Sequence, residues 1–328
     1  MRIPFALLIL VAASSCAHGA PLHDRLASAA VTPDGEGRVA VSVLDLSVGT
    51  RASIHGDAWM PMMSVFKLPL AVLALDQVDH GQLKLDQRLT IAEADVDDSE
   101  NMPVATAWKN GEHAPTLEEL LVWLIQYSDN TAADQLLALL GGGTAVTARL
   151  HALGVMGIQI VEPEVSIGAR LECSGRPAPA GGWTFAAEHS CPDVPEAQKA
   201  AAAQHEVAAS NNVATPDGLV DLLARLDRGT LLTETSRRWL LRTMEGTRNG
   251  LRRIKGMLPL GTPVAHRPGT AYPGDMSVAI NDVGIVTMPD GRRFAIAVME
   301  SGSRASFQAQ EDTIARLARS AWDALLGP

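Results

Sequence analysis

The segment that organises this chain is MSVFKLPLAVLALDQVDHGQL, residues 63–83. Its apolar residues recur with helical periodicity, and Gly81 is a suitable residue to end the helix. Pro69 lies inside the segment, and we expect it in the first helical turn, where a missing N–H costs little. The pattern predicts a helix that begins in the core and carries Ser64 and Lys67 at its start.

Strand patterns lie on both sides of this helix, near the two ends of the chain. Residues 38–45 alternate apolar and polar side chains, and residues 51–55 continue after a turn. Residues 277–287 and 293–300 are rich in β-forming side chains and are joined by an Asp-Gly pair, a strong hairpin signal. We therefore predict an α/β (α+β) fold, with one antiparallel sheet built from N- and C-terminal strands and flanked by helices.

The middle of the chain predicts an all-helical subdomain, in which Thr116 to Glu119 form a capping box before an apolar run. Glycines and prolines break the pattern over residues 168–212, where we expect a long, largely irregular surface excursion. We expect one domain over residues 21–328 with an insert at about 167–213. The expected helices beyond the first cover about residues 117–124, 130–140, 144–153, 216–226, 233–244 and 310–326.

Composition limits the function. Apolar residues make up 47% of the 328 residues and charged residues 20%, which is typical of soluble globular proteins. The formal net charge of −10 leaves no basic excess to neutralise phosphates, so we expect no nucleic-acid partner.

The first twenty residues predict a signal peptide. Arg2 is followed by a short apolar run at 5–13 and then by small residues. A membrane span needs about 20 apolar residues, more than this run offers, and no other stretch is apolar enough. Cleavage before residue 21 and lipidation at Cys16 remain alternatives. Either predicts an exported protein, periplasmic or secreted.

Cysteine and histidine usage argues for a disulfide and against a metal. Once Cys16 is set aside, Cys173 and Cys191 form an even pair in a compartment that permits disulfides, and we predict that they bond. The histidines show no metal-ligand spacing, so we predict neither metal nor cofactor.

Three short motifs carry residues suited to nucleophilic catalysis. Ser64 and Lys67 are three residues apart on a helix and share a face, so the lysine can take the proton of the serine hydroxyl. Ser128 and Asn130 lie at a junction between two apolar helices, where short polar side chains can enter a cleft.

The third motif, Arg267-Pro268-Gly269-Thr270, precedes the hairpin strands. Its cation can bind a substrate carboxylate, and Gly269 permits close approach to the backbone. Each motif alone has an ordinary structural explanation, but their order and separations point to one site.

Together the motifs resemble those of class A serine β-lactamases and the related penicillin-binding peptidases. The run Ser128-Asp-Asn-Thr-Ala-Ala-Asp-Gln-Leu-Leu137 resembles the family's S-D-N-T-A-A-x-x-L-L, and residues 280–286 resemble its penultimate strand. The resemblance covers about residues 38–166 and 214–326. It implies a five-stranded antiparallel sheet, an active site between sheet and helical subdomain, β-lactam substrates and a monomer.

The resemblance also implies residue roles. Ser64 is the nucleophile, with Lys67 as its base and Glu162 acting through a water as the alternative. Ser128 delivers the proton to the β-lactam nitrogen, and the backbone N–H groups of Ser64 and Thr270 form the oxyanion hole. Asn130 holds a substrate amide, while Arg267, Gly269 and Thr270 receive the substrate carboxylate.

Residues 162–166, Glu-Pro-Glu-Val-Ser, resemble the family's omega-loop motif E-P-x-L-N. Glu162 then activates the deacylating water, with Ser166 beside it, and Glu164 is the alternative base.

Two departures leave rival functions open. Pro268 replaces the residue between cation and glycine and removes an N–H that a central strand needs. Ser166 replaces an asparagine that orients water, which predicts slow deacylation. A D-alanyl-D-alanine peptidase and a β-lactam-binding sensor that stays acylated are therefore the alternatives to a hydrolase. Glu162 argues against the peptidase, and the lack of a predicted membrane span argues against the sensor.

Overall fold

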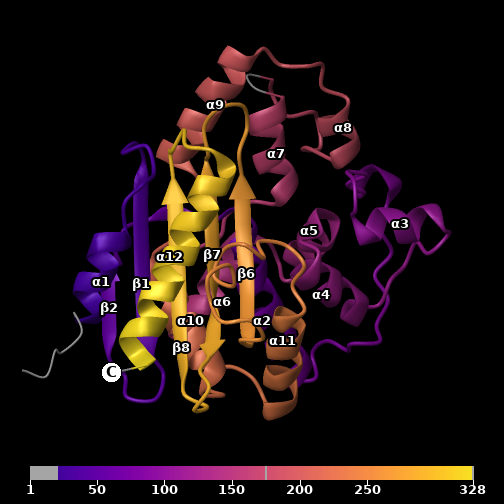
Figure 1. The fold of residues 1–328 in the computed structure, drawn as a ribbon. Helices are drawn as coiled ribbons and strands as arrows, with labels where there is room; N and C mark the ends of the chain where they lie inside the picture. Colours follow the sequence, from indigo (N-terminus) through magenta and orange to yellow (C-terminus); the bar gives the residue numbers. More distant parts are fainter. Residues whose placement is uncertain (1–20, 174–175, 327–328) are drawn as a thin grey trace, which may run out of the picture.

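The computed structural model describes residues 21–173 and 176–326, and it places a β-sheet beside a group of helices (Figure 1). The predicted signal segment, with Cys16, lies outside the described residues. None of the described helices is both long and apolar enough to cross a membrane.

The main sheet has five antiparallel strands in the order β2-β1-β8-β7-β6, which confirms the predicted fold. Its N-terminal strands lie at one side, and the C-terminal hairpin of β7 and β8 together with β6 forms the remainder, so strand β1 pairs directly with β8. Strand β6 pairs only with β7 and is therefore an edge strand. The strands are β1 (Arg38–Asp45), β2 (Arg51–Ile54), β6 (Val264–Ala271), β7 (Ala279–Thr287) and β8 (Arg293–Ser301).

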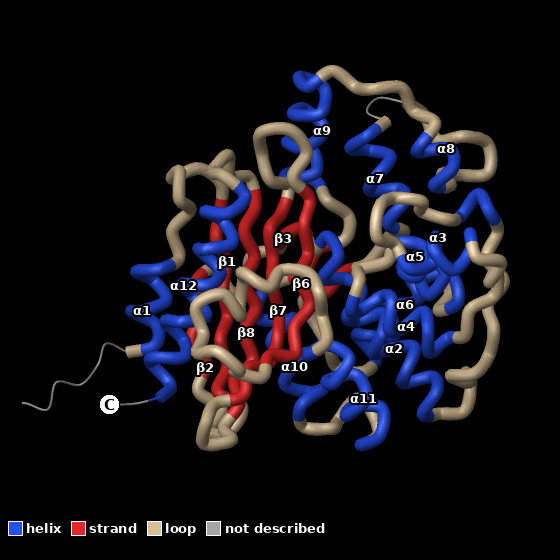
Figure 2. Tube along the Cα trace, turned by 45° about the vertical axis from the view of Figure 1, so that its right-hand side comes forward, coloured by secondary structure: helices blue, strands red, loops and turns tan. Residues whose placement is uncertain are grey.

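Helices cover both faces of this sheet (Figure 2). Since side chains alternate between faces along a strand, β8 divides its apolar residues between two cores. Phe294 and Ile296 pack under α1 (Leu22–Ala29) and α12 (Phe307–Leu326), while Ala295 and its same-face neighbours join the core of the helical subdomain. The sheet therefore serves as the shared wall of both cores.

The helical subdomain is built around α2 (Lys67–Asp79), whose first ten residues are buried. Pro69 is its third residue, and the chain reaches it through the 3₁₀ turn η1 (Met63–Phe66) rather than a continuous α-helix. The predicted capping box at Thr116 is present. The other helices are α3 (Pro103–Lys109), α4 (Leu117–Gln126), α5 (Asn130–Leu139), α6 (Gly143–Ala152), α10 (Pro216–Asp227) and α11 (Glu234–Glu245), and a 3₁₀ turn, η2, spans Glu93–Asp95.

The insert is more regular than its glycines and prolines indicated. Three helices occupy it: α7 (Glu164–Glu172), α8 (Phe185–His189) and α9 (Glu196–Ala209). The alanine-rich stretch has the intrinsic propensity to form α9, and the prolines fall between helices. The predicted disulfide is present, because Cys173 at the end of α7 is bonded to Cys191 just after α8.

Candidate active site

A small second sheet brings together the two segments that carry the candidate catalytic groups. Its strands are β3 (Met60–Pro61), β4 (Ile158–Gln159) and β5 (Val213–Ala214), with β5 in the middle. Strand β3 runs directly into η1, and β4 leads to the acidic motif at 162–166. Short strands far apart in sequence thus place Ser64 close to that motif.

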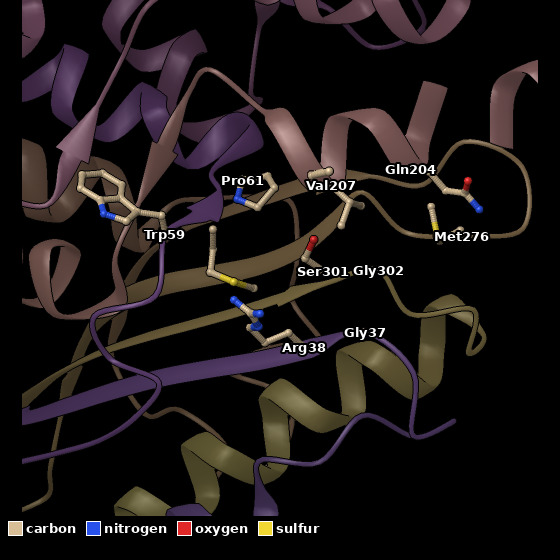
Figure 3. Close-up of a pocket in the computed structure, with 11 residues that line it drawn as sticks. Gly37, Arg38, Trp59, Pro61, Gln204, Val207, Met276, Ser301 and Gly302 are labelled. Carbon is tan, nitrogen blue, oxygen red and sulfur yellow. The ribbon is translucent and has the colours of Figure 1, made fainter. Parts of the chain in front are cut away.

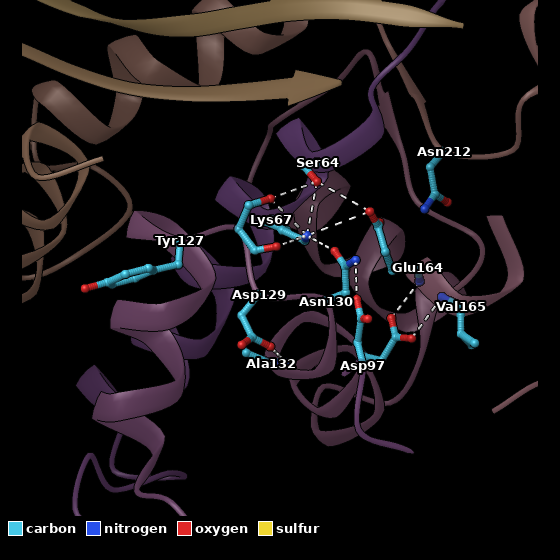
Figure 4. Close-up of polar contacts among 12 residues, drawn as sticks. Ser64, Lys67, Asp97, Tyr127, Asp129, Asn130, Ala132, Glu164, Val165 and Asn212 are labelled. Atoms are coloured by element: carbon cyan, nitrogen blue, oxygen red, sulfur yellow. Dashed lines mark hydrogen bonds and ion pairs between the residues drawn. The ribbon is translucent and has the colours of Figure 1, made fainter. Parts of the chain in front are cut away.

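Ser64 and Lys67 meet as predicted. The Lys67 ammonium donates a hydrogen bond of 3.0 Å to the Ser64 hydroxyl and others to the Ser128 carbonyl (2.7 Å) and the Asn130 side-chain oxygen (2.5 Å) (Figure 4). Lys67 is fully buried, and burial lowers its pKa to about 8, with Glu164 opposing the shift and Arg267 adding to it. A lysine with this pKa can exchange a proton with the serine near neutral pH.

Ser128, at the junction of α4 and α5, makes a further contact with Ser64. Its hydroxyl donates to the Ser64 hydroxyl at 3.0 Å, and Asp129 caps α5 by accepting from the Ala132 N–H. Ser128 has a φ of +68°, and Met63, beside the nucleophile, has a φ of +43°. Non-glycine residues in the left-handed region cost about 1–3 kcal/mol each and concentrate at functional sites.

The two glutamates of the acidic motif have different surroundings. The carboxylate of Glu164 lies 3.4 Å from the Ser64 hydroxyl and 3.7 Å from the Lys67 ammonium. The carboxylate of Glu162, to which we assigned the water-activating role, instead binds the Arg170 guanidinium through both oxygens, at 2.5 and 2.6 Å. Of the two, the structure brings Glu164 to the nucleophile.

Asp134 on α5 holds Glu164 in this position. Its carboxylate accepts from the backbone N–H groups of Glu164 (2.6 Å) and Val165 (3.1 Å), while burial raises its pKa to about 7. The Ser166 hydroxyl makes no hydrogen bond with the residues that the structure describes, so it does not join this group of contacts.

Arg267 lies behind the reacting groups rather than in open space. It is fully buried, and its guanidinium donates to the Ser64 carbonyl (3.0 Å) and the Ser128 hydroxyl (2.6 Å). Burial lowers its pKa to about 10, with Glu164 opposing the shift. Ser128 thus accepts from a cation while it donates to Ser64.

Pro268 and Gly269 fit the edge strand without a bulge. Pro268 pairs in register with Asp282, and no other strand among the described residues lies on the outer side of β6, where an N–H at this position would be needed. A Cβ at Gly269 would lie 2.4 Å from the Met62 carbonyl oxygen. The glycine therefore lets the strand approach the turn that carries Ser64, a different use from the ligand approach we expected.

The cleft opens beside Ser64 into a cavity of about 280 Å³ whose lining includes Ser128, Thr270 and Arg253. Arg253 donates to the Thr270 hydroxyl at 2.7 Å and is paired with Glu311. Our sequence reasoning missed Arg253, since nothing in its local pattern marks it. It supplies a cation on the side of the cleft where we expected Arg267 to do so.

A larger cavity of about 560 Å³ lies between α9 and the ends of β1 and β8 (Figure 3). Its lining includes Arg38, Trp59, Gln204 and Ser301, and none of the residues around Ser64. The larger of these two cavities is therefore not the one that contains the candidate catalytic residues.

Comparison with known proteins agrees with this geometry. Residues 22–325 match the beta-lactamase enzyme family. The extended-spectrum beta-lactamase PER-1 of Pseudomonas aeruginosa is 32% identical over 263 residues, which cover 80% of this chain and 74% of that protein. The chain belongs to the beta-lactamase enzyme family, as a class A serine β-lactamase.

Solved structures show the same fold. A beta-lactamase from Chitinophaga pinensis superposes with a TM-score of 0.74 at 31% identity, covering 93% of this chain and 97% of that one. An ancestral class A beta-lactamase superposes with a TM-score of 0.73 at 26% identity, covering 92% and 99%.

Proposed function

We propose that this enzyme hydrolyses β-lactam antibiotics through an acyl-enzyme on Ser64, which a water activated by Glu164 clears. One observation carries the proposal: the Ser64 hydroxyl has Lys67 at 3.0 Å, Ser128 at 3.0 Å and Glu164 at 3.4 Å. Base, proton donor and second base surround one nucleophile, which acylation and deacylation both require.

In the acylation step, neutral Lys67 takes the proton of the Ser64 hydroxyl while its oxygen attacks the β-lactam carbonyl carbon. The C–N bond of the ring breaks, and Ser128 delivers a proton to the nitrogen. Ser128 recovers a proton from Lys67, whose ammonium lies 3.2 Å from its hydroxyl. The nearby Arg267 guanidinium stabilises negative charge that develops on the Ser128 oxygen.

The backbone N–H groups of Ser64 and Thr270 form the oxyanion hole in this proposal. The substrate carboxylate binds in the cavity beside Arg253 and Thr270, with Arg267 behind Ser128 adding positive charge to that side.

Deacylation returns the serine. Glu164 takes a proton from a water that attacks the ester carbonyl, the bond to Ser64 breaks, and Glu164 passes this proton to the departing serine oxygen. Glu164 replaces Glu162 in this role because the Glu162 carboxylate is occupied by Arg170.

The test is intact mass after mixing with benzylpenicillin, sampled from seconds to an hour, together with loss of free β-lactam. A transient adduct with continuing substrate loss supports the hydrolase, and Ser64→Ala should form no adduct. A permanent adduct without turnover would replace the proposal with a sensor or a peptidase.

Export through the N-terminal twenty residues belongs to the same proposal. Arg2 and the apolar run that follows support it, and the mass of the protein recovered from the producing cells tests it. Loss of residues 1–20 indicates simple cleavage, and a lipid mass on Cys16 indicates an anchor.

A further inference from the structure

A second cavity, of about 160 Å³, opens on the other side of the catalytic groups. Asn130 and Glu164 line it, and α8 of the insert forms its outer wall. The cavity combines an apolar surface with carboxylates. Its apolar lining includes Met63, Ile167, Leu171 and Phe185, and its acidic lining is Asp97, Glu164 and Glu188, with His189 beside them.

Glu188 differs from the other carboxylates of this cavity because it has no partner. It makes no hydrogen bond or ion pair with the residues that the structure describes, whereas Asp97 accepts from Asn130 and Ser99 and lies 3.5 Å from His189. Glu188 is half-buried, and burial together with the negative charges of Asp97, Glu172 and Glu164 raises its pKa to about 7. A cation bound beside it would relieve both effects.

Gly168 on α7 leaves room for this carboxylate. A Cβ at residue 168 would lie 2.4 Å from the Glu188 Oε1 atom, so the side chain rests against a helix position that has no side chain of its own. The disulfide joins Cys173, at the end of α7, to Cys191, just beyond α8. The Glu188 carboxylate, carried by α8, thus lies against α7 at the cavity wall.

The chemistry of a penicillin indicates what enters this cavity. Its ring carboxylate and its acylamino side chain project from opposite ends of the bicyclic nucleus. With the β-lactam carbonyl at Ser64 and the carboxylate beside Arg253, the acylamino side chain extends toward the cavity formed by α7 and α8. This step rests on the proposed function.

We propose that Glu188 is a specificity-determining residue that favours substrates whose acyl side chain bears a cationic group, such as a primary ammonium, next to an apolar ring. The apolar walls receive the ring, and Glu188 receives the cation. The same charges disfavour a carboxylate on that side chain, since like charges brought together in a partly buried site repel.

Three penicillins that share a phenylacetyl side chain test this preference: benzylpenicillin, ampicillin and carbenicillin carry hydrogen, ammonium and carboxylate on the same side-chain carbon. The measurement is kcat/KM for each, expressed relative to benzylpenicillin, because this ratio removes general effects on catalysis. Glu188→Gln should lower the ampicillin ratio about fivefold and raise the carbenicillin ratio. Glu188→Lys should reverse the preference between the two.

The matched control is Asp193→Asn, which removes one negative charge from an exposed position after α8 that neither lines the cavity nor shifts the pKa of Glu188. Its ratios should equal those of the wild type. Glu188→Gln breaks no side-chain hydrogen bond, so we expect it to fold. Glu188→Lys is an independent test, because it places a positive charge where the wild type has a negative one.

The outcomes separate the two proposals. Ratios that stay the same in Glu188→Gln and Glu188→Lys, with benzylpenicillin still hydrolysed, overturn the role of Glu188 and leave the proposed function intact. A wild type that turns over none of the three compounds overturns the proposed function itself.

Discussion

Glu162 and Arg170 form an ion pair with two hydrogen bonds, of 2.5 and 2.6 Å, that closes the segment carrying Glu164. Arg170 also binds Glu206 of α9, a residue that is almost fully buried, at 2.9 and 3.0 Å. One guanidinium thus ties the acidic motif to the insert. The segment that carries Glu164 is thus closed by a contact that includes neither Ser64 nor Lys67, while Asp134 holds the backbone of Glu164 itself.

Replacement of the two glutamates should have different effects. Glu164→Gln should lower turnover of benzylpenicillin at least about 100-fold, because a general base is lost, and the Ser64 adduct should accumulate. Glu162→Gln should keep most deacylation, since Arg170 retains Glu206 as a partner. Rapid-quench mass spectrometry measures both. Adduct accumulation in Glu162→Gln alone would return the base to Glu162.

Removal of the bridging cation should destabilise the fold. Arg170→Met leaves Glu206 buried without a partner, and loss of one member of a buried ion pair costs about 3 kcal/mol. Urea unfolding measures the change in free energy, with the exposed Arg176→Met as the control. Equal stability of the two variants would show that the bridge contributes nothing to folding.

Acylation should depend on the protonation of Lys67. Its pKa of about 8 lies below the ordinary 10.5, so the neutral base becomes available as the pH rises, and the acylation rate should increase and level off above about 8. Glu164 raises this pKa, so the midpoint should fall in Glu164→Gln. Stopped-flow adduct formation between pH 6 and 10 follows both, and a flat profile would exclude Lys67 as the base.

A buried carboxylate away from the site should govern the alkaline limit of stability. Glu300 on β8 is fully buried, neither of its oxygens has a hydrogen-bond partner among the described residues, and burial raises its pKa to about 8 from 4.5. The folded state keeps a proton that the unfolded state releases, so the stability from this group is present in acid and is lost as the pH rises through about 8.

Glu300→Gln should therefore flatten the decline of stability between pH 5 and pH 9. Denaturant unfolding at the two pH values measures this decline. Between pH 5 and pH 9 the variant should lose less free energy of unfolding than the wild type, by about 2 kcal/mol or more. Parallel declines in both proteins would show that Glu300 stays protonated or finds a partner.

Sequence reasoning reached those parts of the site that depend on local geometry. Ser64 and Lys67 are one turn apart, and Ser128 and Asn130 follow a helix end, so short-range rules place them correctly. The antiparallel sheet followed from alternation and one hairpin turn.

The remaining parts depend on contacts distant in sequence. The choice between Glu162 and Glu164 is made by Arg170 and Asp134, which no motif connects to them. Pro268 is tolerated because β6 is an edge strand, a property of strand order rather than of residues 264–271. Arg253 reaches the cleft only through the tertiary fold.

The bond between Cys173 and Cys191 gives the cleft a dependence on where the protein matures. Ser64, Lys67 and Ser128 come from segments that the bond does not join, whereas it ties α8, a wall of the cavity that Glu188 lines, to the end of α7. A preparation made in a reducing cytosol would then contain an intact nucleophile beside an untethered wall. Antibiotic profiles measured on such material would then show a wider range of hydrolysed β-lactams than profiles of the protein that an oxidising compartment produces.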